Sequence, residues 1–354
     1  MRYASYFPLR FLRLSILFLF WALLPVAYAE PLEQGESVLF FPAITAFSEE
    51  EPLILTVDAW VFEEESRPFF ETALNTWLGR NPDEEPPEAQ ARFRERARYF
   101  QTEARADKQI FVRIGKNVHS LPPTDARGRT SGQITIYPDD VQWQENGAGH
   151  AAFSLEAPEH AAHGQESYGW IVPRAGVFVV SDIDDAIKDS SVRDKKALVK
   201  KSLFEPFTAI EGMAAWYREL ADTNEGTFFC YLSGSPAALY PALVDFLQKE
   251  NFPAGALYLR DIRARDLLSS KKTSLKTHKT TALEQLARDF PQRRFILIGD
   301  SGESDPEIYA DFARHYPERV LSIHIRDVTS ESRDAARYAQ TFLDLAPSLW
   351  NIRE

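Results

Sequence analysis

The chain has 354 residues, of which 44% are apolar and 26% are charged, and its formal net charge is -12. This length is enough for two domains, the composition is ordinary for a globular protein, and the acidic balance argues against a nucleic-acid partner. The single cysteine, Cys230, excludes an intrachain disulfide. It lies in an apolar run, so we interpret it as a small buried hydrophobe rather than a catalytic thiol.

The first 29 residues have the pattern of a secretory signal peptide. Three arginines precede an almost wholly apolar run over residues 14–24, and Pro25 and the small-x-small sequence Ala27-Tyr28-Ala29 follow it. The run is shorter than the about 20 residues that a membrane-spanning helix needs, which favours cleavage over the alternative of a retained anchor. We therefore predict an exported protein that is periplasmic or secreted after cleavage.

Residues 30–172 are predicted to form a smaller β-rich domain with a helical insertion. The insertion lies between Arg67 and Arg105 and is broken by the Pro-rich acidic segment Asn81–Pro87. The strand candidates are residues 37–41, 53–62, 109–114 and 132–137. Because Gly and Pro clusters separate short strands, a small antiparallel sandwich or barrel is the expected class.

Residues 173–354 are predicted to form an α/β domain with a doubly wound parallel sheet. The strand candidates are residues 176–181, 227–232, 254–259, 294–298 and 319–325, and helical periods over residues 209–220, 236–250, 280–289 and 306–315 lie between them. Alternating strands and helices of this kind are typical of successive βαβ units.

An apolar run from Gly176 to Val180 ends abruptly in carboxylates, among them Asp182 and Asp184. Clustered carboxylates repel one another and favour a bound cation, and the carboxyl end of a strand in an open α/β sheet is where ligands bind. One carboxylate of such a pair can attack phosphorus, and the other can protonate the leaving oxygen and later activate water. The motif therefore indicates phosphoryl-transfer chemistry.

Two further positions carry groups that could bind a phosphate. Ser233 and Gly234 follow an apolar strand and offer a hydroxyl and a backbone N–H. Lys279, at the start of a predicted helix, offers a cation that would offset charge on the phosphate and on the nucleophile. Each signal is weak alone, because most Ser-Gly pairs are turns and most lysines are solvated.

A second strand, residues 294–298, also runs into acids, at Asp300 and Asp305. Mg²⁺ prefers hard oxygen ligands in octahedral geometry and usually keeps several waters. The sequence therefore predicts a magnesium cofactor, with the metal site formed by Asp182, Asp184, Asp300 and Asp305. Asp305 could act through a water, and Asp185 is expected to support the site from outside it.

The order Asp-x-Asp, Ser, Lys and Gly-Asp-x4-Asp resembles that of the haloacid-dehalogenase-like phosphatases. Within that superfamily, Ser181–Lys188, Tyr231–Pro236, Phe252–Gly255 and Gly299–Tyr309 are similar to the Mg²⁺-dependent phosphatidate phosphatase catalytic-domain family, known from a fungal actin-patch protein. Pro122–Gly128 of the first domain is similar to it as well. The resemblance implies a haloacid-dehalogenase-like fold and a phosphatidate-like lipid phosphate as substrate.

The resemblance also implies roles for individual residues. Asp182 would be the nucleophile, Asp184 the general acid and base, and Ser233 and Lys279 phosphate ligands, with Asp300 and Asp305 at the metal. Two positions depart from the family pattern: Ala186 stands where the family usually has Thr, and Gly234 stands where it often has Asn. Without the threonine hydroxyl that the family usually has at this position, Ala186 could slow turnover or relax the geometry of Asp184.

Two alternative functions stay open at this point. The substrate could be a soluble phosphate ester, or the protein could be a catalytically silent phosphate- or lipid-binding protein. Two basic clusters, Lys195, Lys196, Lys200 and Lys201 and then Lys271, Lys272 and Lys276, could contact a membrane surface peripherally. A solvated helix face and a polar loop are the favoured interpretation of these lysines.

Overall fold

The computed structural model describes residues 29–49, 51–65, 68–81, 84–157, 163–164, 166–261 and 273–353. The predicted signal peptide lies outside these residues except for Ala29, and Lys271 and Lys272 also lie outside them. Among the helices of the described ranges, none is both long and apolar enough to cross a membrane.

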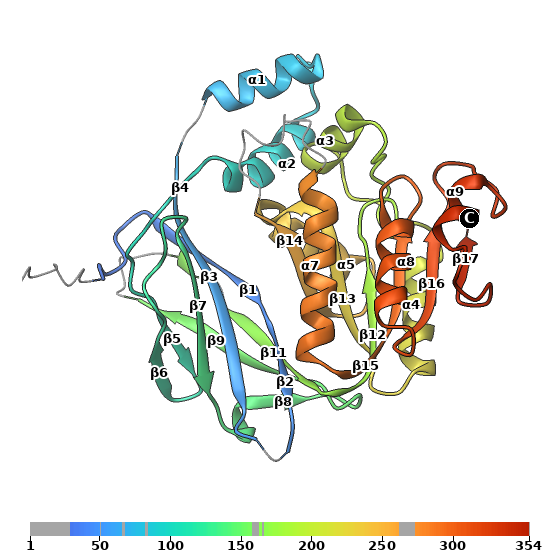
Figure 1. Cartoon of the computed structure of the whole chain (residues 1–354). Helices are drawn as coiled ribbons and strands as arrows, with labels where there is room; N and C mark the ends of the chain where they lie inside the picture. Colours follow the sequence, from blue (N-terminus) through green and yellow to red (C-terminus); the bar gives the residue numbers. More distant parts are fainter. Residues whose placement is uncertain are drawn as a thin grey trace, which may run out of the picture.

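The first part of the chain forms two β-sheets, coloured blue to green in Figure 1. In one sheet the strands are ordered β10 (His163–Gly164), β1 (Glu36–Pro42), β3 (Ile54–Glu64) and β4 (Thr102–Ala104), and β7 (Arg129–Thr135) also pairs with β3. In the other they are ordered β2 (Ile44–Phe47), β11 (Ser167–Pro173), β9 (Gly149–Glu156), β5 (Phe111–Ile114) and β6 (Asn117–Ser120), with β8 (Val141–Trp143) on β9.

These two sheets enclose a common core, as the predicted sandwich requires. Alternate residues of β3 are buried, and Leu55 and Val57 pack in one apolar cluster with Val112 of β5 and Ile171 of β11. Most strand pairs are antiparallel, as expected, but β1 pairs in parallel with β10 and β2 with β11.

The helical insertion docks onto the second part of the chain. It consists of α1 (Pro68–Leu78), α2 (Pro87–Ala97) and the 3-10 helix η2 (Arg98–Phe100). Arg92 and Arg96 of α2 donate hydrogen bonds to the carbonyls of residues 202, 204 and 205, at the end of α3 (Lys195–Leu203). Carbonyls at the end of a helix lack a partner within the helix, so α2 satisfies polar groups of the second part of the chain.

The second part contains the predicted parallel sheet. Its six strands are ordered β14 (Gly255–Arg260), β13 (Phe228–Pro236), β12 (Ala175–Ser181), β15 (Gln292–Asp300), β16 (Val320–Arg326) and β17 (Trp350–Arg353), and every pair is parallel. The five predicted strands are confirmed, and β17 adds a sixth that the sequence analysis did not anticipate. Parallel strands buried on both faces appear as continuous apolar runs, which explains why they were predictable.

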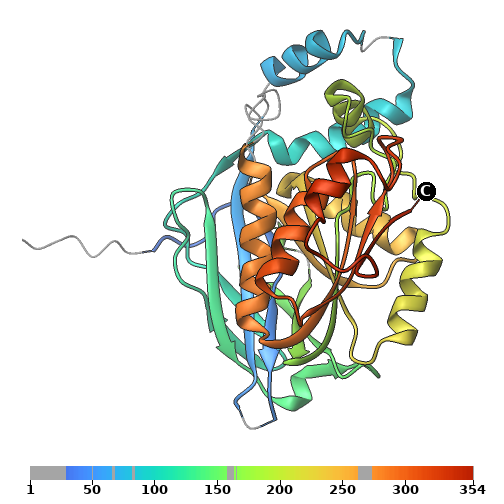
Figure 2. The same ribbon diagram turned by 45° about the vertical axis from the view of Figure 1, so that its right-hand side comes forward.

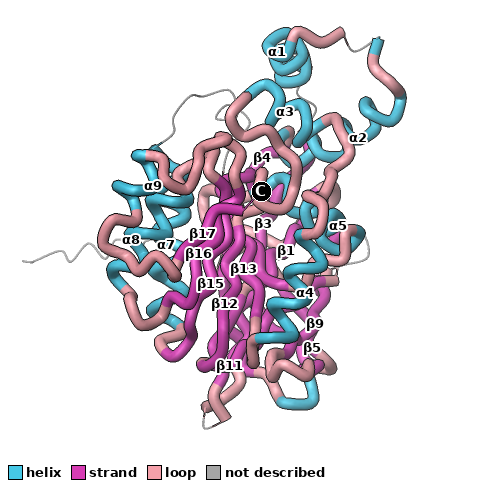
Figure 3. The backbone as a smooth tube through the Cα atoms, turned by 90° about the vertical axis from the view of Figure 1, so that its right-hand side faces the viewer, coloured by secondary structure: helices cyan, strands magenta, loops and turns pink. Residues whose placement is uncertain are grey.

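Helices cover both faces of this sheet, as Figure 3 shows. On one face Val177 and Val179 of β12 pack with α4 (Met213–Thr223) and α5 (Tyr240–Lys249). On the other face Phe178 and Val180 pack with α7 (Thr273–Asp289) and α8 (Asp305–His315), which lie side by side in Figure 2. The short helix α9 (Ala336–Thr341) follows β16.

The carboxyl ends of the central strands meet at one edge of the sheet. In the register of β12, Ser181 lies opposite Tyr231 of β13 and Ile298 of β15. The residues that follow these positions therefore emerge together, at the edge where ligands bind in open α/β sheets.

Candidate active site

Asp182 is the first residue beyond β12 and is held from both sides. Its backbone N–H donates to the carbonyl of Ile298 at 2.8 Å. The hydroxyl of Ser181 donates to the carbonyl of Asp182 at 2.5 Å and lies 2.7 Å from the hydroxyl of Tyr217 on α4. The Asp182 side chain is fully buried, and among the described residues Oδ2 of its carboxylate has no polar partner, while Oδ1 lies 3.0 Å from the Lys279 ammonium. A buried polar atom without a partner is rare, and a bound ion or a catalytic role is among its explanations.

Asp300 ends β15 beside Asp182. Its Oδ1 accepts hydrogen bonds from the backbone N–H of Gly302 at 2.6 Å and of Glu303 at 3.1 Å, which fixes the carboxylate. Its Oδ2 is buried and has no hydrogen-bond partner. Gly302 allows this tight turn, because a Cβ there would lie 3.0 Å from Asp300 Oδ1 and 2.9 Å from side chains of Val192 and Val328.

One carboxylate oxygen each from Asp182, Asp300 and Glu303 lies within 4.8 Å of the others. Three converging carboxylates, two of them with orphaned oxygens, are the hard oxygen donor set that Mg²⁺ prefers. The residues present therefore fit a bound magnesium ion. The sequence analysis did not single out Glu303, which joins Asp182 and Asp300 in this group.

Asp305 instead pairs with Lys279. The Lys279 ammonium lies 2.5 Å from Asp305 Oδ1, 3.0 Å from Asp182 Oδ1 and 3.2 Å from Glu303 Oε2. The other oxygen of Asp305 accepts from the backbone N–H of Asp300 at 3.3 Å. Gly299 allows this approach, since a Cβ on it would lie 2.3 Å from Asp305 Oδ2. The contact with a metal that we predicted for Asp305 stays a prediction.

The charges in this cluster do not balance. Four carboxylates, those of Asp182, Asp300, Glu303 and Asp305, surround the single ammonium of Lys279. Burial raises the pKa of Asp182, of Asp300 and of Glu303, and neighbouring carboxylates add to the rise although Lys279 opposes it. Burial lowers the pKa of Lys279, but Asp182, Asp305 and Glu303 raise it well above its usual range. The cluster therefore favours one more cation.

Asp184 lies in a different set of contacts from Asp182. Its carboxylate pairs with Lys188 at 2.7 Å and accepts hydrogen bonds from Ser190 and Ser235 at 2.7 Å and from Ser233 at 3.1 Å. Burial alone would raise its pKa, but Lys188 and these hydroxyl groups lower the pKa of Asp184 to about 2. Asp184 is thus joined to the predicted phosphate ligand Ser233, whereas its predicted metal contact stays a prediction.

Ala186 and Gly234, the two residues that differ from the family pattern, are both enclosed by other parts of the chain. Gly234 faces Leu275 of α7, and a Cβ on Gly234 would lie 2.7 Å from Leu275 Cδ1. An asparagine there would need Leu275 to move, so the glycine and the leucine fit each other. Ala186 has no exposed surface. In the same loop Asp185 accepts three backbone N–H groups, from residues 190, 191 and 192, which agrees with a supporting role.

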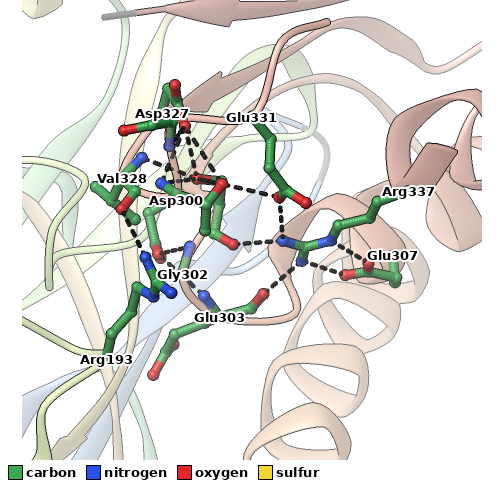
Figure 4. Close-up of polar contacts among 12 residues, drawn as sticks. Arg193, Asp300, Gly302, Glu303, Glu307, Asp327, Val328, Glu331 and Arg337 are labelled. Carbon is green, nitrogen blue, oxygen red and sulfur yellow. Dashed lines mark hydrogen bonds and ion pairs between the residues drawn. The ribbon is translucent and has the colours of Figure 1, made fainter. Parts of the chain in front are cut away.

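Arg337 of α9 clamps the loop that carries Asp300 and Glu303, as Figure 4 shows. Its guanidinium donates to the carbonyls of Ser301 at 2.5 Å and Glu303 at 2.8 Å, and it pairs with Glu307 of α8 at 2.8 Å. These bonds tie the loop to α8 and α9. The sequence analysis missed this arginine, because nothing in its local sequence separates it from a surface residue.

Comparison with known proteins supplies the family of this part of the chain. Residues 177–327 match the model of "Phosphatidate phosphatase APP1, catalytic domain". This segment belongs to that family. The chain is similar to phosphatidate phosphatase APP1 of Saccharomyces cerevisiae, with 31% identity over 182 residues, which are 51% of this chain and 30% of the yeast protein.

A second relative is also fungal. The chain is 34% identical over 165 residues to the uncharacterized protein C29B5.04c of Schizosaccharomyces pombe, across 46% of this chain and 27% of that one. The chain therefore spans about a third or less of each curated relative. Among solved structures, chitinase ChiW from Paenibacillus covers 84% of this chain and 28% of its own length at 9% identity, and its TM-score of 0.18 carries no inference.

Proposed function

We propose that the protein is a Mg²⁺-dependent phosphomonoesterase that hydrolyses phosphatidate or a similar lipid phosphate, within the haloacid-dehalogenase-like fold. One observation carries the proposal: the buried carboxylate of Asp182 has only Lys279 as a polar side-chain partner among the described residues, at 3.0 Å from Oδ1, and it converges with the carboxylates of Asp300 and Glu303. The family of the segment supports phosphatase chemistry. The lipid substrate rests on what the printed name of the yeast relative says of that protein.

The residues divide the reaction among them. Asp182, Asp300 and Glu303 would hold the magnesium ion, which supplies charge neutralisation at the phosphate and at the attacking carboxylate. Ser233, through its hydroxyl, and Gly234, through its backbone N–H, bind phosphate oxygens, and the Lys279 ammonium offsets their charge. One carboxylate oxygen of Asp182 attacks phosphorus, the ester P–O bond breaks, and an aspartyl-phosphate forms on Asp182.

Asp184 is proposed as the general acid and base. Lys188 and the hydroxyl groups keep Asp184 ionised in the structure, so the acid step requires that Asp184 first take up a proton from solvent as the phosphate ester binds. It then gives this proton to the leaving ester oxygen, and as the carboxylate it takes a proton from the water that attacks the aspartyl-phosphate. This water releases inorganic phosphate and restores the Asp182 carboxylate. The hydrogen bond between Ser233 and Asp184 supports this assignment, because it joins the acid to a phosphate ligand.

The test of this function is release of inorganic phosphate from phosphatidate in detergent mixed micelles. We expect purified residues 30–354 to release phosphate with Mg²⁺, to stop with EDTA, and to recover when Mg²⁺ is added in excess. A parallel panel of soluble phosphate esters separates the soluble-substrate alternative. If the wild-type protein hydrolyses no phosphate ester with Mg²⁺, the catalytically silent binding protein is the remaining alternative.

Export and membrane contact are proposals separate from the chemistry. We propose that residues 1–29 direct the protein to the periplasm or the exterior. In α3, Lys200 pairs with Glu205 at 3.1 Å and Lys201 with Asp189 at 2.6 Å. Lysines paired within their own surface are typical of a solvated helix face, so we propose no strong membrane attachment through α3.

Glu303 gives a sharp test of the metal site. Glu303→Gln removes one charged ligand while keeping the side-chain shape, so we expect Mg²⁺ to bind at least about tenfold more weakly, which is about 1.4 kcal/mol. Isothermal titration calorimetry with Mg²⁺ measures the change. The matched control is Glu284→Gln on α7, where the exposed carboxylate only pairs with Arg288 at 3.7 Å. Equal Mg²⁺ affinity in Glu303→Gln and Glu284→Gln would show that Glu303 is not a ligand of the metal.

A further inference from the structure

A cavity of about 460 Å³ lies between the β-rich half and the edge of the parallel sheet. Phe41 of β1 and Ala59 of β3 line one side, and Leu257 and Leu259 of β14 line the other. Figure 1 shows β14 and α7 on the side of the parallel sheet that faces these β-strands. The volume is within the range of about 300–1,000 Å³ that small-molecule sites occupy.

The charged groups of this cavity do not suit a phosphate. Among the described residues that line it, Asp58, Asp125 and Asp261 carry carboxylates and Arg129 carries a guanidinium. The Arg129 guanidinium already pairs with Asp261 at 3.3 Å and lies 4.7 Å from the ring centroid of Phe41. Burial raises the pKa of Asp58, against a hydrogen bond from Ser131 and the charge of Arg129. A phosphate anion would meet three carboxylates, so an uncharged group fits better.

The cavity adjoins the phosphate-binding side of the active site. Tyr258 of β14 lies opposite Leu232 of β13, the residue just before Ser233, and neighbouring strands are only about 4.8 Å apart. His278, which also lines the cavity, precedes Lys279 on α7 and its Nε2 lies 3.3 Å from the carbonyl of Tyr258. The cavity is thus one strand away from the residues proposed to bind phosphate.

We propose that this cavity receives the uncharged, mainly apolar part of the phosphate ester while its phosphate lies at Asp182. For a lipid phosphate, that part is the acyl portion of the glyceride. The inference rests on the proposed function, and it gives the β-rich half a role: Phe41 and Ala59 supply one wall of the substrate site. Selectivity for a lipid over a small phosphate ester would then depend on residues outside the family segment as well as on Leu257 and Leu259 within it.

Filling the cavity tests the inference. In Leu259→Trp and in Leu257→Trp, we expect the ratio of kcat/KM for dioleoyl phosphatidate to that for p-nitrophenyl phosphate to fall at least about tenfold. Leu343→Trp, the same change at a residue that is 82% exposed and far from the cavity in sequence, should leave this ratio unchanged. Thermal unfolding of each variant identifies any that fails to fold, and two variants keep the test open if one does.

A second measurement does not need turnover. Dioctanoylglycerol has acyl chains but no phosphate, and we expect calorimetry to show it bound by wild type and bound at least about tenfold more weakly by Leu259→Trp and Leu257→Trp. Unchanged ratios together with unchanged binding would overturn the cavity inference while leaving the phosphatase proposal intact. If wild type hydrolyses no phosphate ester, the proposed function fails, and the binding result alone supports or overturns the cavity.

Discussion

Asp182→Asn is expected to reduce phosphate release from phosphatidate by at least about 10³-fold, because an amide cannot form the aspartyl-phosphate. The same change should make the protein without Mg²⁺ more stable. Asp182 is fully buried beside other carboxylates, and removing its charge relieves both its desolvation and that repulsion. We expect a thermal midpoint higher by about 2 °C or more, with the fold retained.

The control for this variant is Asp245→Asn on α5. Asp245 is exposed and pairs only with Lys249 at 2.7 Å in the contacts that the structure gives it, so activity and midpoint should stay at wild-type values. Both measurements use the same phosphate-release assay and the same heating rate. Asp182→Asn that keeps more than about a tenth of wild-type activity would refute the covalent mechanism.

Lys279→Met should have the largest effect on stability. The Lys279 side chain has no exposed surface and lies within 3.2 Å of Asp182, Glu303 and Asp305. Removing one partner of a buried ion pair leaves uncompensated charge and typically costs about 3–5 kcal/mol. We therefore expect a loss of this size in the free energy of unfolding by urea without Mg²⁺, together with loss of activity.

Lys276→Met is the matched control on the same helix. Its side chain is 56% exposed and its ammonium pairs with Asp311 at 3.4 Å, so its replacement should change the free energy of unfolding by less than about 1 kcal/mol. Adding Asp305→Asn to Lys279→Met should recover part of the lost stability, since one of the unpaired carboxylates is then neutral. A urea midpoint of Lys279→Met equal to that of wild type would show that the cluster does not depend on this cation.

The sequence was sufficient to predict the central strands and the acids that follow them. Buried parallel strands are apolar throughout, and Asp182 and Asp300 interrupt that pattern at the strand ends. In the structure both carboxylates are fully buried, so they do not belong to solvated turns. Lys279 was predicted at the start of a helix, but α7 begins at Thr273, so Lys279 lies in the second turn. There it shares a face with Leu283 and Leu286, both buried, and this spacing could have indicated its burial.

Other features depend on contacts that no local pattern encodes. Glu303 and Asp305 lie in the same acidic turn and both contact Lys279, and only the three-dimensional path of the turn brings Glu303 together with Asp182 and Asp300. Arg337 reaches the site from a helix more than thirty residues further along the chain. The strand β17 is only four residues long, too short for a clear periodic signal.

Besides the hydrogen bonds between α2 and the end of α3, an apolar cluster joins the two parts of the chain. It contains Val179 of β12 and Ile183, the residue between Asp182 and Asp184, together with three aromatic residues that precede residue 177: Trp60, Phe62 and Phe93. The apolar layer next to Asp182 is therefore built partly by the β-rich half and its helical insertion. The family segment, residues 177–327, contains none of these three aromatic side chains. Because a close-packed core transmits a local change in volume, a substitution at Phe93 would alter the packing of this layer.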